Sequence, residues 1–294
     1  MGKYTKQLSV KSRITSLTLV RRANERLHFF KMANNDIVDN LIAAAAVKDW
    51  AQVRFMLSNY PLIEEKIRKL FTEAELGNQE GMVTILNEDQ RYINVPDSEG
   101  MTVLMKAALS RRSLEVWMLC HRNGLDVNIQ DETERTALMF ASIYCSRDAV
   151  RAICEQGADV DISPRATGTT ALMLAATHNR FENVQELCER GADIQTPDMG
   201  GRTALIWAAY NGRLSIVQYL CERGADIQHE SIIGKTALIW AATRGFPLVA
   251  EYLCKRGTLV TRFPIPYIFN NQCRELIRRQ LERCLLYTSP SPRD

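Results

Sequence analysis

A segment that opens with a threonine and closes with a cysteine occurs five times in this 294-residue chain. Successive threonines are separated by 34, 34, 33 and 33 residues, and the cysteines repeat at the same intervals. A constant period of this size indicates one structural unit stacked many times, so it determines the fold class before any single residue is considered. The positions are Thr102, Thr136, Thr170, Thr203 and Thr236, and Cys120, Cys154, Cys188, Cys221 and Cys254.

Each copy carries the local signals of two helices joined by a turn. Thr203 is a residue that caps a helix by accepting hydrogen bonds from its first amides, and Leu205 and paired alanines follow at helical spacing. Asn211-Gly212 then turns the chain into a second apolar helix, and Gly224 ends it in the left-handed conformation that glycine tolerates. Neither helix can bury its apolar face alone, so stacked neighbours must bury it together.

This unit resembles the ankyrin repeat, and the resemblance spans most of the chain. The family's usual proline after the threonine is Ala or Val here, and its usual histidine is Met or Ile. These departures bear on the family's Thr–His hydrogen-bond network and leave the expected fold unchanged. One copy shows the motif: Gly201-Arg202-Thr203-Ala204-Leu205-Ile206-Trp207-Ala208-Ala209, Asn211-Gly212, Ile216-Val217, Leu220-Cys221 and Gly224-Ala225-Asp226-Ile227.

The resemblance implies an all-α ankyrin-repeat solenoid of about seven helix-turn-helix repeats in residues 32–260. Five repeats are regular and two degenerate copies precede them, one containing Ile42 and Leu57, the other Phe71 and Leu86. We expect irregular hairpins in these two copies, and we expect the first to be the amino-terminal cap, since terminal repeats must tolerate water on one side.

Residues 261–283 are predicted to form a carboxy-terminal cap. The prolines of Phe263-Pro264-Ile265-Pro266 prevent a helix from continuing, and Asn270 is then a suitable start for a helix that runs to Leu281. Its apolar side, which includes Cys273 and Ile277, would cover the last repeat. The alternative is a short basic partner-binding helix that uses the arginines of this segment.

Residues 284–294 resemble the translation of a common transposase-end sequencing adapter, residue by residue. We therefore interpret them as an adapter artefact in a truncated gene model and expect the natural protein to diverge after Arg283. A natural Ser-Pro-rich tail is the alternative. The matching run is Cys284-Leu285-Leu286-Tyr287-Thr288-Ser289-Pro290-Ser291-Pro292-Arg293-Asp294.

The amino-terminal segment, residues 1–31, is strongly basic. It contains eight lysines and arginines against Glu25, so it contributes +7 to a net charge of +3 and leaves −4 for the rest. We expect a disordered arm, or an untranslated leader with Met32 rather than Met1 as the true start. A mitochondrial presequence and a nucleic-acid or membrane contact are the alternatives. Because the remainder is mildly acidic, we expect the repeats not to bind nucleic acid.

The sequence lacks the motifs of common catalytic and cofactor sites, such as Gly-x-x-x-x-Gly-Lys-Ser/Thr, Gly-x-Gly-x-x-Gly and His-Glu-x-x-His. We therefore expect no enzymatic activity, no cofactor and no metal. Zinc ligands cluster at short spacing, and stacked repeats about 10 Å apart are too distant for disulfides. The cysteine row is thus interpreted as small buried apolar groups. With no run of 18 apolar residues and no secretory signal, we expect a cytoplasmic protein, with the nucleus as the alternative.

The resemblance implies a binding surface, here called the concave face, formed by the hairpin tips and the exposed ends of the inner helices. Apolar core positions recur between copies, whereas these positions vary, as expected for specific recognition. Their mixture of Tyr, Met and Arg suits a protein interface, and ordinary solvated surface is the alternative. The predicted protein-binding residues are Arg135, Tyr144, Thr177, His178, Met199, Arg202, Tyr210, Asn211, Lys235, Thr243 and Arg244.

The function expected from these features is a non-catalytic, monomeric scaffold or adaptor that binds other proteins through the concave face. The alternative is the substrate-recognition arm of a larger enzyme, such as a kinase or a ubiquitin ligase, with the catalytic part beyond this sequence. Both expectations depend on analogy with the fold, because nothing in the sequence identifies a partner.

Overall fold

The computed structural model describes residues 37–257 and 270–288, with side chains described up to residue 279. The predictions made for residues 1–31, and for the last six residues of the adapter-like segment, lie outside this part of the chain. Across the described residues the backbone is helical, and extended pairing is confined to one isolated bridge between Gln130 and Thr136.

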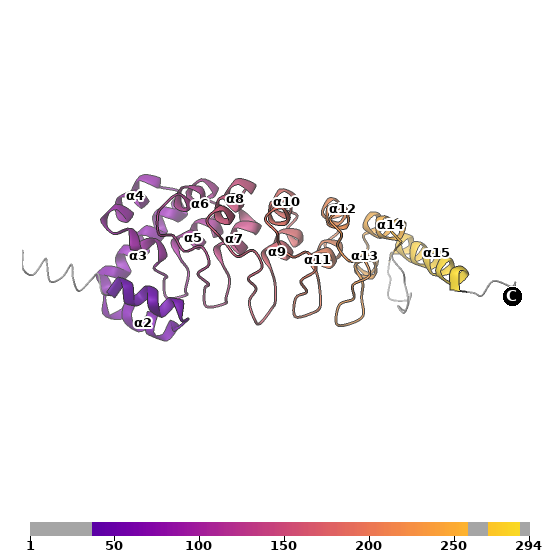
Figure 1. Ribbon diagram of the computed structural model, residues 1–294, viewed down its shortest axis with the longest axis horizontal. Helices are drawn as coiled ribbons and strands as arrows, with labels where there is room; N and C mark the ends of the chain where they lie inside the picture. The colour runs from indigo at the N-terminus through magenta and orange to yellow at the C-terminus, as the bar shows by residue number, and fades with distance from the viewer. Residues whose placement is uncertain (1–36, 258–269, 289–294) are drawn as a thin grey trace, which may run out of the picture.

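The helices occur as seven consecutive pairs, which we number repeats 1 to 7, and two parallel rows of helices run along most of the stack with the hairpin loops on one side (Figure 1). The predicted all-α ankyrin-repeat solenoid is confirmed. The pairs are residues 37–46 with α2 (Trp50–Asn59), α3 (Pro61–Leu76) with α4 (Gln79–Glu88), α5 (Val103–Leu109) with α6 (Ser113–Cys120), α7 (Ala137–Tyr144) with α8 (Arg147–Glu155), α9 (Ala171–Thr177) with α10 (Phe181–Glu189), α11 (Ala204–Tyr210) with α12 (Leu214–Glu222), and α13 (Ala237–Arg244) with α14 (Pro247–Lys255); the 3-10 helix η1 (Gln90–Asn94) follows α4 and α15 (Asn271–Thr288) follows α14.

In each regular repeat we call the first helix the inner helix and the second the outer helix. The repeated threonine starts the inner helix, as its sequence position predicts. The hydroxyl of Thr203 accepts a hydrogen bond from the amide of Ile206 at 3.4 Å, and Thr102, Thr170 and Thr236 make the equivalent bond. Thr136 is the exception, since it takes part in the isolated bridge and its side chain caps nothing. Four of the five helix starts therefore use the predicted cap.

Small residues bring the two helices of a repeat, and neighbouring repeats, close together. Ala208 and Ala209 are completely buried, and Leu205 and Ile206 beside them are buried against the adjoining inner helices. Polar side chains link the loops as well: Asn128 accepts from the amide of Asp159 at 2.9 Å and donates to the carbonyl of Gly157 at 3.1 Å. Each repeat thus supplies both apolar surface and hydrogen bonds to the next, as solenoid stability requires.

The cysteine row is less deeply buried than predicted. Cys120 and Cys221 are buried, but Cys154, Cys188 and Cys254 are half-buried. Burial raises the pKa of Cys120 to about 12 and that of Cys154, Cys188 and Cys221 to about 11. A raised pKa keeps a thiol protonated at neutral pH, so these side chains behave as small apolar groups.

Repeat 1 does not continue the two rows of helices. Figure 1 shows α2 below α3, at the level of the hairpin loops. Arg54 forms an ion pair with Glu132 and donates to the carbonyl of Ser98, and Lys48 reaches Glu134 at 3.1 Å. The first pair is therefore a terminal element that lies against the hairpins of repeats 3 and 4, a placement that the weak sequence repeat did not predict.

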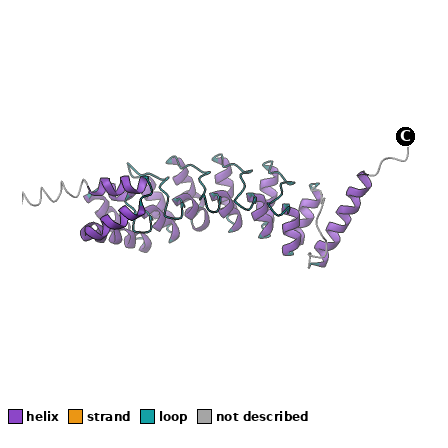
Figure 2. Cartoon of the chain, turned by 90° about the horizontal axis from the view of Figure 1, so that it is seen from below, coloured by secondary structure: helices purple, strands orange, loops and turns teal. Residues whose placement is uncertain are grey.

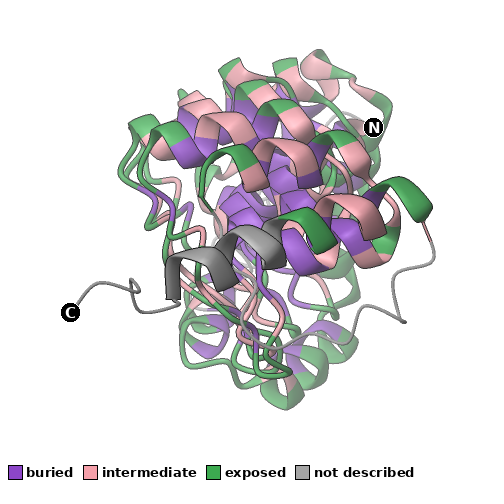
Figure 3. Ribbon diagram, turned by 90° about the vertical axis from the view of Figure 1, so that its right-hand side faces the viewer, coloured by how far each residue is buried: buried purple, intermediate pink, exposed green. Residues whose placement is uncertain are grey.

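The predicted carboxy-terminal helix is present as α15. Asn270 caps it by accepting from the amide of Cys273 at 3.0 Å, and the helix runs to Thr288 rather than ending at Leu281. Cys273 and Ile277 are buried against α13 and α14, as their apolar spacing predicts. Figure 2 shows α15 inclined to the helices of the stack, and Figure 3 shows it in front of the last pair when the stack is viewed from this end.

Candidate protein-binding face

Repeat symmetry places the predicted binding residues on two neighbouring parts of the chain. Arg135, Arg202 and Lys235 each directly precede the threonine of an inner helix, at the end of a hairpin. The others, apart from Met199 at a hairpin tip, lie at the carboxy-terminal ends of α7, α9, α11 and α13. The predicted residues thus recur at hairpin ends and inner-helix ends from repeat 4 to repeat 7.

The densest part of this series is an aromatic cluster in repeats 6 and 7. The ring centroids of Trp207 and Tyr210 lie 5.8 Å apart, and those of Tyr210 and Trp240 lie 5.1 Å apart, both edge to face. Such pairs contribute about 0.5–1.5 kcal/mol beyond the apolar area that they bury. The cluster therefore joins the two repeats across their boundary.

Cationic side chains surround these rings. The guanidinium of Arg202 lies 4.0 Å from the Trp207 ring centroid, that of Arg244 lies 4.5 Å from Tyr210, and the ammonium of Lys235 lies 4.5 Å from Trp240. We call these six residues the cation–aromatic cluster. The sequence pattern predicts four of them but not Trp207 and Trp240. Both tryptophans occupy the fourth position after the repeat threonine, where the residue type changes from copy to copy.

A buried carboxylate, Asp198, fixes the repeat 6 half of this cluster. One of its oxygens accepts from the amides of Gly200 and Arg202, both at 2.8 Å, and thereby closes the hairpin turn. The other oxygen accepts from Arg202 Nε at 2.9 Å and from Trp207 Nε1 at 3.0 Å. Arg202 is therefore held by an internal ion pair, and its exposed surface is available to a partner only in this fixed orientation.

Repeat 4 has a similar arrangement. Asp131 accepts from the amide of Arg135 at 2.8 Å and from its Nε at 2.9 Å, and the guanidinium lies 4.7 Å from the ring centroid of Phe140. Tyr144, at the end of α7, has Arg111 of repeat 3 over its ring at 5.8 Å. Arg135 and Tyr144 thus lie in a separate region from the cation–aromatic cluster.

Among the remaining predicted residues, Asn211 and Thr243 are less available than their positions suggested. Asn211 donates to the carbonyl of Trp207 at 2.9 Å, and Thr243 donates to that of Ile239 at 2.7 Å, so both polar side chains bond to their own helices. Thr177 and His178 end α9 in repeat 5, where His178 is exposed as predicted. The Met199 side chain is 63% exposed at the tip of its hairpin.

Adjacent hairpins are connected to one another by backbone hydrogen bonds. The amide of Met199 donates to the carbonyl of Thr167 at 2.9 Å, and the amide of Ile232 donates to that of Gly200 at 3.0 Å. Ile232 and Ile233 are 74% and 63% exposed at the last of these tips. The apolar tips of repeats 6 and 7 therefore stand next to each other and beside the cation–aromatic cluster.

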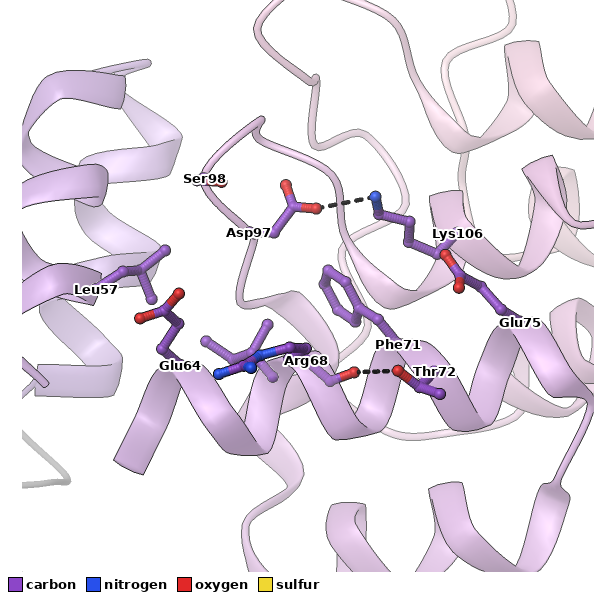
Figure 4. A pocket seen from close by; sticks show the side chains of 10 residues that line it. Leu57, Glu64, Arg68, Phe71, Thr72, Glu75, Asp97, Ser98 and Lys106 are labelled. Atoms are coloured by element: carbon purple, nitrogen blue, oxygen red, sulfur yellow. Dashed lines mark hydrogen bonds and ion pairs between the residues drawn. The ribbon is translucent and has the colours of Figure 1, made fainter. Parts of the chain in front are cut away.

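The amino-terminal end of the same face contains a hollow of about 270 Å³ between α3, α5 and the hairpin at Asp97 and Ser98 (Figure 4). Phe71 lies in its wall, and Lys106 of α5 pairs with Asp97 at 3.1 Å. Glu64, Arg68 and Glu75 add charges of both signs, so this hollow shows no preference for one kind of ligand.

The outer row of helices has a different chemistry. Glu186 of α10 is buried and accepts from Arg147, Arg151 and Arg190, at distances between 2.7 and 3.3 Å. Burial raises the pKa of this carboxyl group, but the hydrogen bonds from Arg151, Arg147 and Arg190 outweigh it and lower the pKa to about 2. This network links repeats 4 and 5 on the side opposite the hairpins.

Within residues 37–257 and 270–279, no group of three or more His, Cys, Asp or Glu side chains has the geometry of a metal site. No described helix is both long and apolar enough to cross a membrane.

The chain belongs to the ankyrin-repeat family. The family model described as "Ankyrin repeats (3 copies)" matches residues 70–164, 114–198, 161–231 and 195–263. The crystal structure of the ankyrin repeat domain of Bcl-3, a member of the IkappaB protein family, is similar with a TM-score of 0.61 and 26% identity, over 71% of this chain and 97% of that one. Ankyrin repeats are protein–protein interaction modules and are typically non-catalytic.

Two mammalian proteins share sequence with part of the chain. "Ankyrin repeat and SAM domain-containing protein 6" of Rattus norvegicus is 34% identical over 101 residues, which is 34% of this chain and 11% of that protein. Its Mus musculus counterpart is 34% identical over 99 residues, or 33% of this chain and 11% of that protein. The matched region is thus about a tenth of each of these longer relatives.

Proposed function

We propose that this chain is a non-catalytic scaffold or adaptor, and that it binds other proteins through the concave face of repeats 5 to 7. The observation that carries the proposal is the cation–aromatic cluster with the apolar tips beside it. Aromatic residues, Met and Arg are enriched in protein interfaces, and Tyr, Trp and Arg dominate their binding energy. The reducing cytoplasm is the proposed location.

The position of repeat 1 favours the carboxy-terminal part of the concave face as the region that binds partners. Arg54 and Lys48 bond to Glu132 and Glu134 in the repeat 4 hairpin, and Trp50 packs against Gly100 in the repeat 3 hairpin. The first two regular hairpins are therefore engaged within the chain. Repeats 5 to 7 have no such cover among the described residues, and they carry the exposed Met199, Ile232 and Ile233.

A second role remains compatible with the same surface. The region matched in the rat and mouse relatives is 11% of their length, so the similarity covers a small part of each of these much longer proteins. The substrate-recognition arm of a larger enzyme is therefore the alternative proposal. Both roles require that the cation–aromatic cluster binds protein.

The test is capture of partners from cell lysate by the full chain and by two matched double variants. Tyr210→Ala with Arg244→Ala removes one aromatic ring and one cation from the cluster. Trp117→Ala with Arg122→Ala removes one aromatic ring and one cation from α6, where Trp117 is 46% exposed, and from the turn that follows it. We expect the first variant to lose captured proteins and the second to retain them, with both folded by circular dichroism. Equal capture by all three would overturn the proposal.

A further inference from the structure

Two cations of repeat 1 reach the hairpin tips of repeats 3 and 4. The Arg54 guanidinium pairs with Glu132 of repeat 4 and donates to the carbonyl of Ser98 in repeat 3 at 3.4 Å. The Lys48 ammonium pairs with Glu134 of repeat 4 at 3.1 Å. Repeat 1 thus bridges two neighbouring hairpins with charged side chains.

An aromatic residue lies between these two cations in the sequence. The half-buried ring of Trp50 contacts the place where the two hairpins meet, since a Cβ added at Gly100 would lie 2.9 Å from Trp50 Cη2 and 2.9 Å from the amide nitrogen of Glu132. Because Gly100 has no side chain, the ring can approach the hairpin backbone closely. Lys48, Trp50 and Arg54, here called the cover residues, therefore contact both hairpins at once.

The hairpin tips under repeat 1 differ in charge from the later tips of the concave face. The tips of repeats 3 and 4 carry Glu99, Glu132 and Glu134, whereas the tips of repeats 6 and 7 are Met199-Gly200 and Ile232-Ile233. The cations of repeat 1 therefore lie on the acidic part of the face. Repeat 1 and the hairpins that it covers are complementary in charge, as two partners in a protein interface are.

Two hollows border the contact between repeat 1 and these hairpins. The first is the hollow of about 270 Å³, which Leu57 of repeat 1 lines together with Phe71 and Asp97 (Figure 4). The second, of about 220 Å³, lies between Ile42 of repeat 1 and the loop that contains Asn128. Repeat 1 therefore rests on the hairpins through a few side chains and leaves space beside them.

A terminal repeat can detach from a solenoid while the rest stays folded, because each repeat is stabilised mainly by its neighbours. Leu41 and Val53 are fully buried, so apolar contacts hold repeat 1 in its closed position. The ion pair that adds to them is partly exposed, with 49% of the Arg54 side chain and 36% of the Glu132 side chain accessible. Such pairs contribute little each and are screened by salt. Repeat 1 is thus the part of the stack that opens most readily at this end.

We propose that repeat 1 is an autoinhibitory cover on the concave face. In its closed position it occupies the hairpins of repeats 3 and 4, and a segment of a partner protein binds them only after repeat 1 has moved away. That segment carries two cations on either side of an aromatic residue, as the cover residues do. The inference goes beyond the proposed function, which concerns repeats 5 to 7, and gives the concave face a second, regulated part.

Opening of the cover is measured by hydrogen–deuterium exchange of residues 37–59 in the full chain. Arg54→Glu places two carboxylates together and should speed exchange there, with α9 and α11 unchanged. Arg54→Glu combined with Glu132→Arg restores the pair in reverse and should return exchange to the wild-type rate. Lys69→Glu, at an exposed position of α3, controls for the change in charge. Equal exchange in all four proteins, or faster exchange that the reversed pair does not correct, overturns the inference.

Binding to the uncovered hairpins is tested with a labelled peptide of this chain's own residues 45–59, which contains the three cover residues. We expect the peptide to bind the Arg54→Glu chain about tenfold or more tightly than wild type, because the closed fraction of wild type lowers its apparent affinity. The same peptide with Lys48→Glu and Arg54→Glu should bind neither chain. No binding to the Arg54→Glu chain, or equal binding to both chains, contradicts the cover.

These measurements separate failure of this inference from failure of the proposed function. If the Tyr210→Ala and Arg244→Ala variant loses partners while the Arg54→Glu chain does not bind the peptide, the proposed function stands and the cover is refuted. If the Arg54→Glu chain binds the peptide while that double variant captures the same proteins as wild type, the cover stands and binding by repeats 5 to 7 is wrong.

Discussion

Gly212, in the turn between α11 and α12, provides a sensitive test of how tightly repeats 6 and 7 pack. Its φ is +70°, and a Cβ added there would clash with Cδ1 of Phe246 and lie 2.6 Å from its Cε1, at the equivalent turn of repeat 7. Gly224, which follows α12 with a φ of +86°, has nothing within 4 Å of such a Cβ. The pair thus separates steric contact between repeats from backbone strain.

Both substitutions to alanine carry the left-handed backbone cost of about 1–2 kcal/mol. Gly212→Ala adds the cost of overpacking against Phe246, typically about 1–3 kcal/mol. We therefore expect Gly212→Ala to lose about 2–5 kcal/mol of unfolding free energy and Gly224→Ala about 1–2 kcal/mol, by the same two principles.

The measurement is urea denaturation followed by circular dichroism, with the slope of the transition compared between variants. The control is the same pair of substitutions in a Phe246→Ala background, where the ring is absent and the two glycine variants should cost the same. Equal losses from Gly212→Ala and Gly224→Ala in the wild-type background would refute the packing argument.

Three further predictions concern the buried core, the Asp198 carboxylate in the repeat 6 hairpin and the ion-pair network around Glu186. Leu205→Ala opens a cavity in the buried row of inner helices and should cost about 2–5 kcal/mol of stability by chemical denaturation. Asp198→Asn places an NH₂ group against the Arg202 and Trp207 donors and should cost about 1–3 kcal/mol, with a shifted Trp207 indole resonance. For Glu186, whose folded pKa of about 2 lies below its ordinary 4.5, ionisation stabilises the fold above pH 4.5 and this contribution is lost as the pH falls toward 2.

Each of these has a defined contrary result. A Leu205→Ala variant as stable as wild type would mean that the inner row is loosely packed. An unmoved Trp207 resonance in Asp198→Asn would show that the carboxylate does not hold the indole. The Glu186 effect is isolated by Glu186→Gln, since the stability difference between wild type and variant should shrink between pH 4.5 and 2; a constant difference contradicts the assigned pKa.

The period of the sequence was sufficient to predict the helices, because the cap, the turn and the closing glycine of each unit are local signals. Thr203 and Gly224 act within a few residues of themselves, and the structure places them as expected. Thr136 departs from the pattern because its hairpin pairs with Gln130, a contact that the period does not encode.

Interactions between distant residues account for what the sequence did not predict. The placement of repeat 1 depends on ion pairs such as Arg54–Glu132, whose partners are 78 residues apart. Trp207 and Trp240 were missed because their position holds Lys, Phe or Leu in other repeats and suggested no common role. Arg202 was selected for its position, but its bond to a buried carboxylate is visible only in three dimensions.

The central claim is that partners bind the concave face of repeats 5 to 7, and hydrogen–deuterium exchange on the full chain tests it most directly. Amide exchange would be compared between the chain alone and the chain bound to a captured partner. We expect slower exchange in the hairpins that precede α9, α11 and α13, most clearly around Met199 and Ile232, and no change in α8, α10 and α12. Protection confined to these outer helices or to α15 would contradict the account.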